Sequence, residues 1–280
     1  MANNIHWFPG HMSKALKEIE NRLKIIDVVI EILDARAPYS SMNKNLEKLI
    51  ANKKKILILS KPDLADPTIL ADTLINLKKK FDIVLDLNLT NPNSEKALSK
   101  AVAILGKDKW QKEISKGMKP QPIRTMIIGI PNVGKSSLIN RLAKRNIAGV
   151  QNKPGYTKGE QWIKVNKDFL LLDTPGVLPM NYDEQQDAIK LALVGSVRED
   201  ILPNHILVEW LIKYLKMNYP DSLKNRFNIE TITDVETVIN AIAANRGLKA
   251  SNGQYDISRS EYLLLKEFKE GLLGRISLEK

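Results

Sequence analysis

The sequence contains no cysteine among its 280 residues, and only three histidines. Disulfides and thiolate metal sites are therefore excluded, and little material remains for a metal centre built on imidazole. No apolar run approaches the ~18 residues of a membrane span. The N-terminus also lacks the charged and apolar regions of a signal peptide. We therefore expect a cytoplasmic protein without a membrane partner.

Charge is distributed unequally along the chain, whose formal net charge is +11. Residues 1–180 carry 30 Lys and Arg against 17 Asp and Glu, whereas residues 181–280 carry 13 against 15. Excess positive charge favours a polyanionic partner, because neutralising phosphates releases bound counterions. Charge alone leaves nucleic-acid contact and simple solubility as equal alternatives.

Short apolar runs rich in β-branched residues predict strands at 27–33, 55–59, 83–87, 125–129, 161–165 and 169–173. Helical patterns lie between several of them, at about 42–52, 67–80, 94–105 and 135–145. This alternation predicts an α/β fold with a doubly wound, mostly parallel sheet. The turn Asn166-Lys167-Asp168 predicts a hairpin of the last two strands, and therefore one antiparallel edge.

Two other segments complete the predicted organisation. The lysine-rich residues 107–121 are interpreted as a solvated linker or a bridge between elements. In the C-terminal third the pattern is helical, with about five helices and with capping boxes at Thr233 and Ser258. We expect two domains, an α/β domain at 1–180 and a small all-helical domain at 181–280.

A phosphate-binding loop is predicted at 129–136, where GIPNVGKS fits G-x-x-x-x-G-K-[ST]. The loop follows an expected strand and opens an expected helix, as this motif requires. Backbone N–H groups of such a loop surround phosphates, Lys135 contacts the β- and γ-phosphates, and Ser136 ligates Mg²⁺. The predicted contact set also includes Asn132, Val133, Gly134 and Ser137.

Two further segments are candidates for sensing the γ-phosphate. Asp173-Thr174-Pro175-Gly176 ends an apolar strand, which would let Asp173 hold Mg²⁺ through water and the Gly176 amide contact the γ-phosphate. Thr157, in Pro154-Gly155-Tyr156-Thr157, could complete the Mg²⁺ shell when the γ-phosphate is present. A plain glycine turn is the alternative interpretation of that segment.

A base-reading motif is predicted at 60–63, where Ser60-Lys61-Pro62-Asp63 resembles N-K-x-D. Asp63 would accept hydrogen bonds from the ring N–H and the amine of guanine, while the Lys61 stem would lie over the base. Ser60 replaces the usual asparagine and reaches less far, which predicts reduced affinity or specificity for guanine. Asn88 begins a loosely matching segment that would close over the base. A P-loop ATPase is the alternative, against which Asp63 argues.

The base-reading motif precedes the phosphate loop, which is the reverse of the order in ordinary small GTPases. Further signatures are Trp7-Phe8-Pro9-Gly10-His11-Met12, Asp34-Ala35-Arg36-Ala37-Pro38, Arg246-Gly247 and FKEGLLGR at 268–275. In this combination the chain resembles the circularly permuted GTPases of ribosome assembly, and among them the ribosome biogenesis GTPase A (YlqF) family. The likeness covers almost the whole chain. It implies a P-loop GTPase sheet in permuted order, followed by a helical domain.

The resemblance also implies a function. Members of this family are Mg²⁺-dependent GTPases that bind GTP and GDP, and they act late in assembly of the large ribosomal subunit, on its RNA. They are slow alone and are stimulated by the ribosomal particle; we expect a monomer. The rival hypothesis is a nucleotide-regulated RNA-binding scaffold with little hydrolysis.

Two candidate residues follow from the resemblance. Val177 stands where Ras-like enzymes have a water-positioning glutamine, so His11 is the candidate that orients or deprotonates water. The alternative for His11, expected in a Pro-Gly turn near a flexible terminus, is docking of the N-terminal segment. Asn132 resembles the asparagine that ligates K⁺ in potassium-stimulated relatives. Its alternative role is a hydrogen bond that stabilises the loop.

Overall fold

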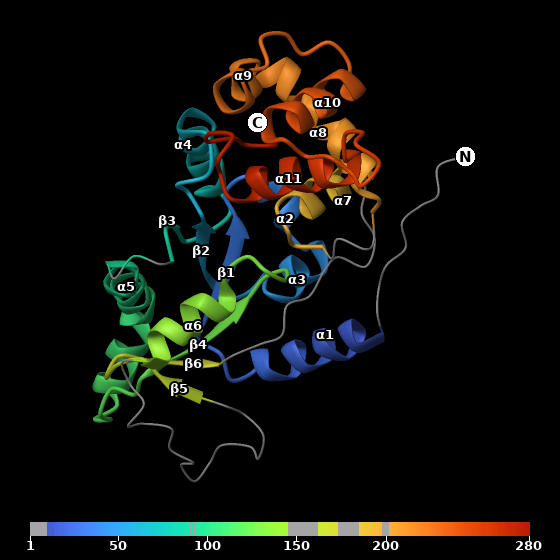
Figure 1. Cartoon of the computed structure of the whole chain (residues 1–280). Coiled ribbons are helices and arrows are strands. Elements are labelled where there is room, and N and C mark those ends of the chain that lie inside the picture. The colour runs from blue at the N-terminus through green and yellow to red at the C-terminus, as the bar shows by residue number, and fades with distance from the viewer. Residues whose placement is uncertain (1–9, 90, 92, 145–161, 173–184, 198–201) are drawn as a thin grey trace.

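The residues that the structure describes include a six-stranded sheet (Figure 1). The computed structural model describes residues 10–89, 91, 93–144, 162–172, 185–197 and 202–280, with backbone alone at 10–13, 15 and 144. The strands are β1 (Val28–Asp34), β2 (Lys54–Ser60), β3 (Ile83–Leu87), β4 (Ile123–Ile128), β5 (Trp162–Lys164) and β6 (Phe169–Leu172). Their order is β3-β2-β1-β4-β6-β5, and β5 pairs antiparallel with β6 while the other pairs are parallel. The expected parallel sheet with one antiparallel edge is confirmed.

Helices cover both faces of the sheet. They are α1 (Gly10–Leu23), α2 (Pro38–Ser41), α3 (Lys44–Leu49), α4 (Pro67–Leu77), α5 (Asn93–Ser115) and α6 (Lys135–Lys144). Alternate strand residues point to opposite faces, and two separate clusters of buried side chains result. Ile30 and Ile58 pack in the cluster that includes α5, whereas Leu33 and Leu57 pack in the cluster that includes α4. This is the doubly wound arrangement that the alternation predicted.

Five helices follow in the described part of the C-terminal region, in agreement with the expected number. They are α7 (Gln185–Leu193), α8 (Asn204–Asn218), α9 (Asp221–Phe227), α10 (Val235–Arg246) and α11 (Ile257–Lys269). The expected N-caps were wrong by one or two positions, because Asp234 and Asp256 accept the capping hydrogen bonds in place of Thr233 and Ser258. Aspartate is as good a cap as serine, so the neighbouring carboxylate displaces the hydroxyl.

Two interpretations of the α/β region, at residues 107–121 and at His11, need correction. Residues 107–121 are not a linker throughout, because α5 continues to Ser115. The Lys109 ammonium donates to the Asp27 carboxylate at 2.7 Å, which holds this part of α5 against the start of β1. The Trp110 indole donates to the Gln121 carbonyl at 2.9 Å, which holds the end of the segment against α5. The expected Pro-Gly turn at His11 is instead the start of α1, whose Ile19 and Leu23 pack in the core.

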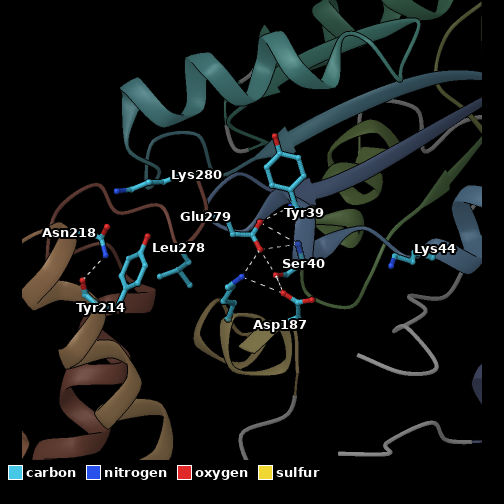
Figure 2. A pocket seen from close by; sticks show the side chains of 10 residues that line it. Tyr39, Ser40, Lys44, Asp187, Tyr214, Asn218, Leu278, Glu279 and Lys280 are labelled. Carbon is cyan, nitrogen blue, oxygen red and sulfur yellow. Dashed lines mark hydrogen bonds and ion pairs between the residues drawn. The ribbon is translucent and has the colours of Figure 1, made fainter. Parts of the chain in front are cut away.

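The chain after α11 returns to the α/β sheet. Glu279 accepts hydrogen bonds from the backbone N–H groups of Tyr39 and Ser40, at 2.7 and 3.0 Å, in the short helix α2 that follows β1. Figure 2 shows this carboxylate beside Ser40 and Asp187, the latter from α7. The C-terminal segment therefore lies at the carboxyl end of the parallel strands, the edge at which open α/β sheets bind ligands.

Candidate guanine-nucleotide site

The phosphate loop connects β4 to α6, and two of its glycines are required by geometry. Gly129 has φ +147°, and a Cβ added there would lie 2.6 Å from the Ile32 carbonyl oxygen on β1. Gly134 has φ +104°, and its added Cβ would lie 2.7 Å from the Leu89 side chain. The left-handed backbone therefore favours glycine at both positions, and at Gly129 the β1 carbonyl leaves no room for a side chain.

The side chains of the phosphate loop divide by burial. Lys135 is buried, and its ammonium donates to the carbonyls of Gly129 and Ile130 at 3.1 and 2.7 Å. Its charge therefore lies over the hollow of the loop. Val133 is fully buried in the core, so it anchors the loop. Ser136 and Ser137 lie exposed in the first turn of α6, the helix end that attracts anions and their metal ions.

Asn132 joins the phosphate loop to the helical region. It adopts a left-handed backbone, with φ +59°, and its amide nitrogen donates to the Gly195 carbonyl at 2.8 Å. Gly195 follows α7, so this bond links the loop to the first helix after the sheet. This bond runs from the loop to a distant segment, and both the K⁺ ligation and the loop-stabilising role of Asn132 stay predictions.

The base-reading loop follows β2. Ser60 is buried, and its hydroxyl donates to the Leu33 carbonyl at 3.0 Å, so it ties β2 to β1. Lys61 has φ +54° and donates to the Asp34 carboxylate at 2.7 Å and to the Asn132 carbonyl at 3.5 Å. Asp63 is exposed in the turn beyond it. Lys61 thus connects the base-reading loop to the phosphate loop, although the two lie far apart in the sequence.

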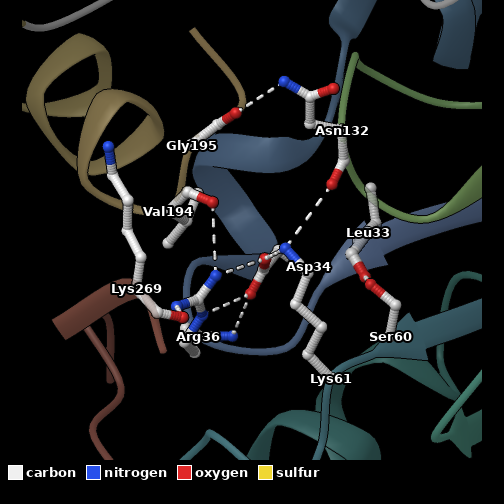
Figure 3. Close-up of polar contacts among 9 residues, drawn as sticks. All are labelled: Leu33, Asp34, Arg36, Ser60, Lys61, Asn132, Val194, Gly195 and Lys269. Carbon is white, nitrogen blue, oxygen red and sulfur yellow. Dashed lines mark hydrogen bonds and ion pairs between the residues drawn. The ribbon is translucent and has the colours of Figure 1, made fainter. Parts of the chain in front are cut away.

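Asp34 and Arg36 form a buried ion pair beneath this connection (Figure 3). The Arg36 guanidinium donates to both Asp34 oxygens at 3.0 and 2.9 Å. It also donates to the carbonyls of Val194 and Lys269, at 3.2 and 3.3 Å, which end α7 and α11. Burial alone would raise the pKa of the Asp34 carboxyl, but Arg36 and Lys61 hold that pKa at about 2.

Sequence reasoning quoted Asp34 and Arg36 as a family signature without assigning them a role. The structure shows that they link Lys61, in the base-reading loop, to two helices of the C-terminal region. The signal available in the sequence was their position at the end of a buried strand, next to the strand that carries the base-reading motif.

Other predicted site residues are only partly placed. Asn88 follows β3 and its carbonyl accepts a hydrogen bond from the Ser94 hydroxyl at 2.7 Å, which supports the start of α5. His11 lies in the first turn of α1, where the structure describes its backbone alone. Thr157, Asp173 and Gly176 lie outside the described residues.

The described residues contain neither a metal-binding cluster nor a membrane-spanning helix. There, His, Asp and Glu side chains do not form a group of three or more that could hold a metal ion. Within the same residues, no helix has the length and apolar character needed to cross a membrane.

Comparison with known proteins agrees with this geometry. Residues 124–246 match the family model described as 50S ribosome-binding GTPase. Ribosome biogenesis GTPase A of Bacillus cereus is 39% identical over 98% of this chain and 93% of its own length. GDP-bound YlqF has a similar fold, with a TM-score of 0.69 and 27% identity over 94% of this chain and 98% of its own. GNP-bound YlqF from Thermotoga maritima gives 0.67 and 26%, over 95% and 98%.

The full-length likeness and the two nucleotide loops lead to one assignment. A relative well above 30% identity covers nearly the whole chain, and two YlqF structures have a similar fold over almost its full length. The chain belongs to the ribosome biogenesis GTPase A family and is a GTP-hydrolysing enzyme of ribosome assembly.

Proposed function

We propose that this GTPase binds precursors of the large ribosomal subunit and promotes their late maturation. The observation that carries the proposal is the meeting of the base-reading and phosphate loops through Lys61, in a chain that matches a 50S ribosome-binding GTPase model. The net charge of +13 on residues 1–180, 30 Lys and Arg against 17 Asp and Glu, supports an RNA partner. We place this role in the cytoplasm and in two domains, 1–180 and 181–280. A monomer is sufficient for it because one chain supplies both loops.

The nucleotide contacts in this proposal follow the placement of the loops. Asp63 accepts hydrogen bonds from guanine, and Lys61 lies along the base. Lys135, whose ammonium already lies over the loop carbonyls, turns to the phosphates when they arrive. Ser136 and Thr157 hold Mg²⁺, which neutralises phosphate charge, and the exposed first turn of α6 suits that use of Ser136. Asn132 is the proposed K⁺ ligand.

His11 is the proposed catalytic residue. Hydrolysis needs an oriented water more than covalent chemistry, and an imidazole can orient water or accept its proton. Residue 11 lies in the helical backbone of α1, which begins at Gly10. The alternative is that His11 docks the N-terminal segment.

The direct test is GTP hydrolysis measured with and without purified large ribosomal subunits. We expect turnover to rise when subunits are added, and Lys135→Ala to remove the rise. An RNA-binding scaffold would instead bind subunits in a nucleotide-dependent way without faster turnover. Small ribosomal subunits provide the matched control, since they offer RNA of similar charge; an equal effect would contradict the proposed partner.

A further inference from the structure

The segment after α11 lies against the loop that reads the base. We call residues 271–279 the C-terminal strap and residues 61–66, between β2 and α4, the base loop. The strap leaves α11 and passes along the base loop before ending at α2. It belongs to no motif of the nucleotide site, and neither the phosphate chemistry nor the proposed base contacts require it.

Three carbonyls of the base loop accept hydrogen bonds from the strap. The Arg275 guanidinium donates to the Ala65 carbonyl at 2.8 Å through Nε and to the Pro62 carbonyl at 2.9 Å through Nη2. Between them, the Leu64 carbonyl accepts from the Ile276 N–H at 2.9 Å. The planar guanidinium therefore spans the turn that carries Asp63.

Two more contacts fix the end of the base loop. The Asp66 N–H donates to the Ser277 hydroxyl at 3.1 Å, just where α4 begins. Gly271 has φ +76°, and a Cβ there would lie 2.5 Å from the Leu64 side chain. The backbone of the strap thus packs against the Leu64 side chain of the loop, and the positive φ favours glycine at that point.

The strap is anchored beyond the base loop. The Leu278 N–H donates to the Arg36 carbonyl at 2.7 Å, and Glu279 accepts from the N–H groups of Tyr39 and Ser40. Lys190 of α7 lies 3.4 Å from the same carboxylate. The position of the strap is therefore set by the segment after β1, by α2 and by α7, and the base loop takes its position from the strap.

Fewer hydrogen bonds form within the base loop than between the base loop and the strap. Leu64 N–H donates to the Lys61 carbonyl at 3.0 Å, and Ala65 N–H donates to the Pro62 carbonyl at 3.4 Å, near the limit for such a bond. We propose that the C-terminal strap, through Arg275, positions the base loop for guanine and so determines base specificity. This inference rests on the proposed base-reading role of Asp63; Arg275 is a positioning residue.

Arg275→Ala should weaken binding of guanine nucleotides selectively. Apparent affinity falls in proportion to the fraction of molecules whose loop is correctly placed. If that fraction drops to a tenth, the Kd for GDP rises roughly tenfold. ADP uses the same phosphate contacts without the Asp63 bonds, so its Kd should hardly change. The measured quantity is the ratio of the two Kd values, from titration with GDP and competition by ADP.

The controls separate positioning from general damage. Arg259→Ala removes an exposed arginine of α11 and should leave both Kd values unchanged. Arg275→Lys keeps a donor that reaches one carbonyl, and should restore part of the GDP affinity. Ser277→Ala removes only the Asp66 contact and should raise the Kd for GDP, relative to that for ADP, by a smaller factor. It is also the test variant if Arg275→Ala does not fold. Thermal unfolding of each variant establishes that it is folded.

Asp63→Asn tests the underlying assignment in the same assay. It should lower GDP affinity and favour xanthosine diphosphate, whose additional carbonyl suits an amide donor. If Asp63→Asn shows this exchange while both strap variants keep the wild-type ratio of GDP to ADP, the strap proposal is overturned and the base assignment stands. A parallel loss of GDP and ADP would also overturn it. No exchange in Asp63→Asn would refute the base assignment itself.

Discussion

The phosphate loop and the base loop are held in place in different ways. In the phosphate loop, Lys135 bonds carbonyls five and six positions before it, and Val133 packs in the core directly beneath. In the base loop, Pro62 and Ala65 are bonded by Arg275, more than two hundred positions later. The phosphate loop is fixed mainly by its own motif, with added contacts from Asn132 to Gly195 and from Lys61, whereas the base loop is fixed mainly by the far end of the chain.

The difference bears on how the helical region can influence the nucleotide. Arg36 joins the ends of α7 and α11 to Asp34, which in turn holds Lys61. A movement of these helices would therefore act on the base loop through Arg36, Asp34 and Lys61. It would act on the phosphate loop mainly through the Asn132–Gly195 bond. Coupling of this kind requires that partner affinity differ between nucleotide states.

The largest effect is expected for His11→Ala, which concerns the reaction and neither loop. A group that orients or activates water typically contributes ~10²–10⁴-fold to rate. Subunit-stimulated turnover should fall by about that factor while GDP affinity is unchanged. His205→Ala, which removes an exposed imidazole on α8, is the matched control. An equal loss of subunit binding and turnover would indicate docking.

Lys135→Ala tests the self-contained loop. Hydrogen bonds to charged groups contribute about 1.5–3 kcal/mol each, so losing the β-phosphate contact should lower the affinity for a nucleoside diphosphate roughly 10- to 10²-fold. GDP and ADP should lose affinity equally, unlike in the strap variants. Lys107→Ala, on the exposed face of α5, should change neither. Normal binding of either nucleotide by Lys135→Ala would rule out the phosphate-loop assignment.

Asp34→Asn should disturb the link between the two loops. It removes the carboxylate charge that pairs with both Lys61 and the buried Arg36. Breaking a buried pair costs roughly 3–5 kcal/mol of stability. The folded pKa of about 2 lies below the unfolded value near 3.8, so this stabilisation is present above pH 4. It is lost as pH falls toward 2. Urea unfolding should separate variant from wild type at pH 7 and less at pH 3.

The control for Asp34→Asn is Asp72→Asn, at an exposed position of α4. This variant removes the same charge without a buried partner, and its stability should match that of wild type. Equal stability of Asp34→Asn and wild type at pH 7 would show that the ion pair does not hold β1 and the base loop together.

Glu31→Gln should have the smallest effect and should spare both loops. Glu31 is buried in β1, and neither carboxyl oxygen has a hydrogen-bond partner among the described residues. Burial, and then Glu47, raise its pKa to about 8. The folded state therefore retains a proton, and stability declines as pH rises from about 4.5 toward 8. Glutamine mimics the neutral acid and should remove up to about 3 kcal/mol of that decline near pH 7.

Urea unfolding at pH 5 and pH 7.5 measures this difference. Wild type and Glu31→Gln should agree at the lower pH more closely than at the higher one, with the variant more stable at pH 7.5. The ratio of GDP to ADP affinity should be unchanged. The same pH dependence in both proteins would mean that Glu31 does not titrate in this range.

The parts that the sequence predicted are those whose determinants are local. Buried parallel strands are nearly continuous apolar runs, and G-x-x-x-x-G-K-S specifies its own turn. The extension of α5 to Ser115 was missed because its lysine-rich surface resembles a linker, and because Lys109 finds its partner at Asp27, far away in the sequence. The start of α1 at Gly10 was missed because its core contacts, Ile19 and Leu23, come late in the helix.

The roles of Arg36 and Arg275 could not be predicted in the same way. Arg36 bonds the Val194 carbonyl 158 positions away, and Arg275 bonds Pro62 at a separation of 213. Both partners are backbone carbonyls, which any residue provides, so no second side chain in the sequence marks the contact. Only the fold brings these positions together.

Hydrogen exchange over the two loops tests the central contrast most directly. In Arg275→Ala, amides of residues 61–66 should exchange faster than in wild type, because the Ala65 carbonyl loses its guanidinium partner and the Pro62 carbonyl keeps only the 3.4 Å bond from the Ala65 N–H. Amides of residues 129–135 should exchange at the wild-type rate, because that loop is held by its own residues. Unchanged exchange at 61–66, or equal acceleration in both loops, would contradict the account.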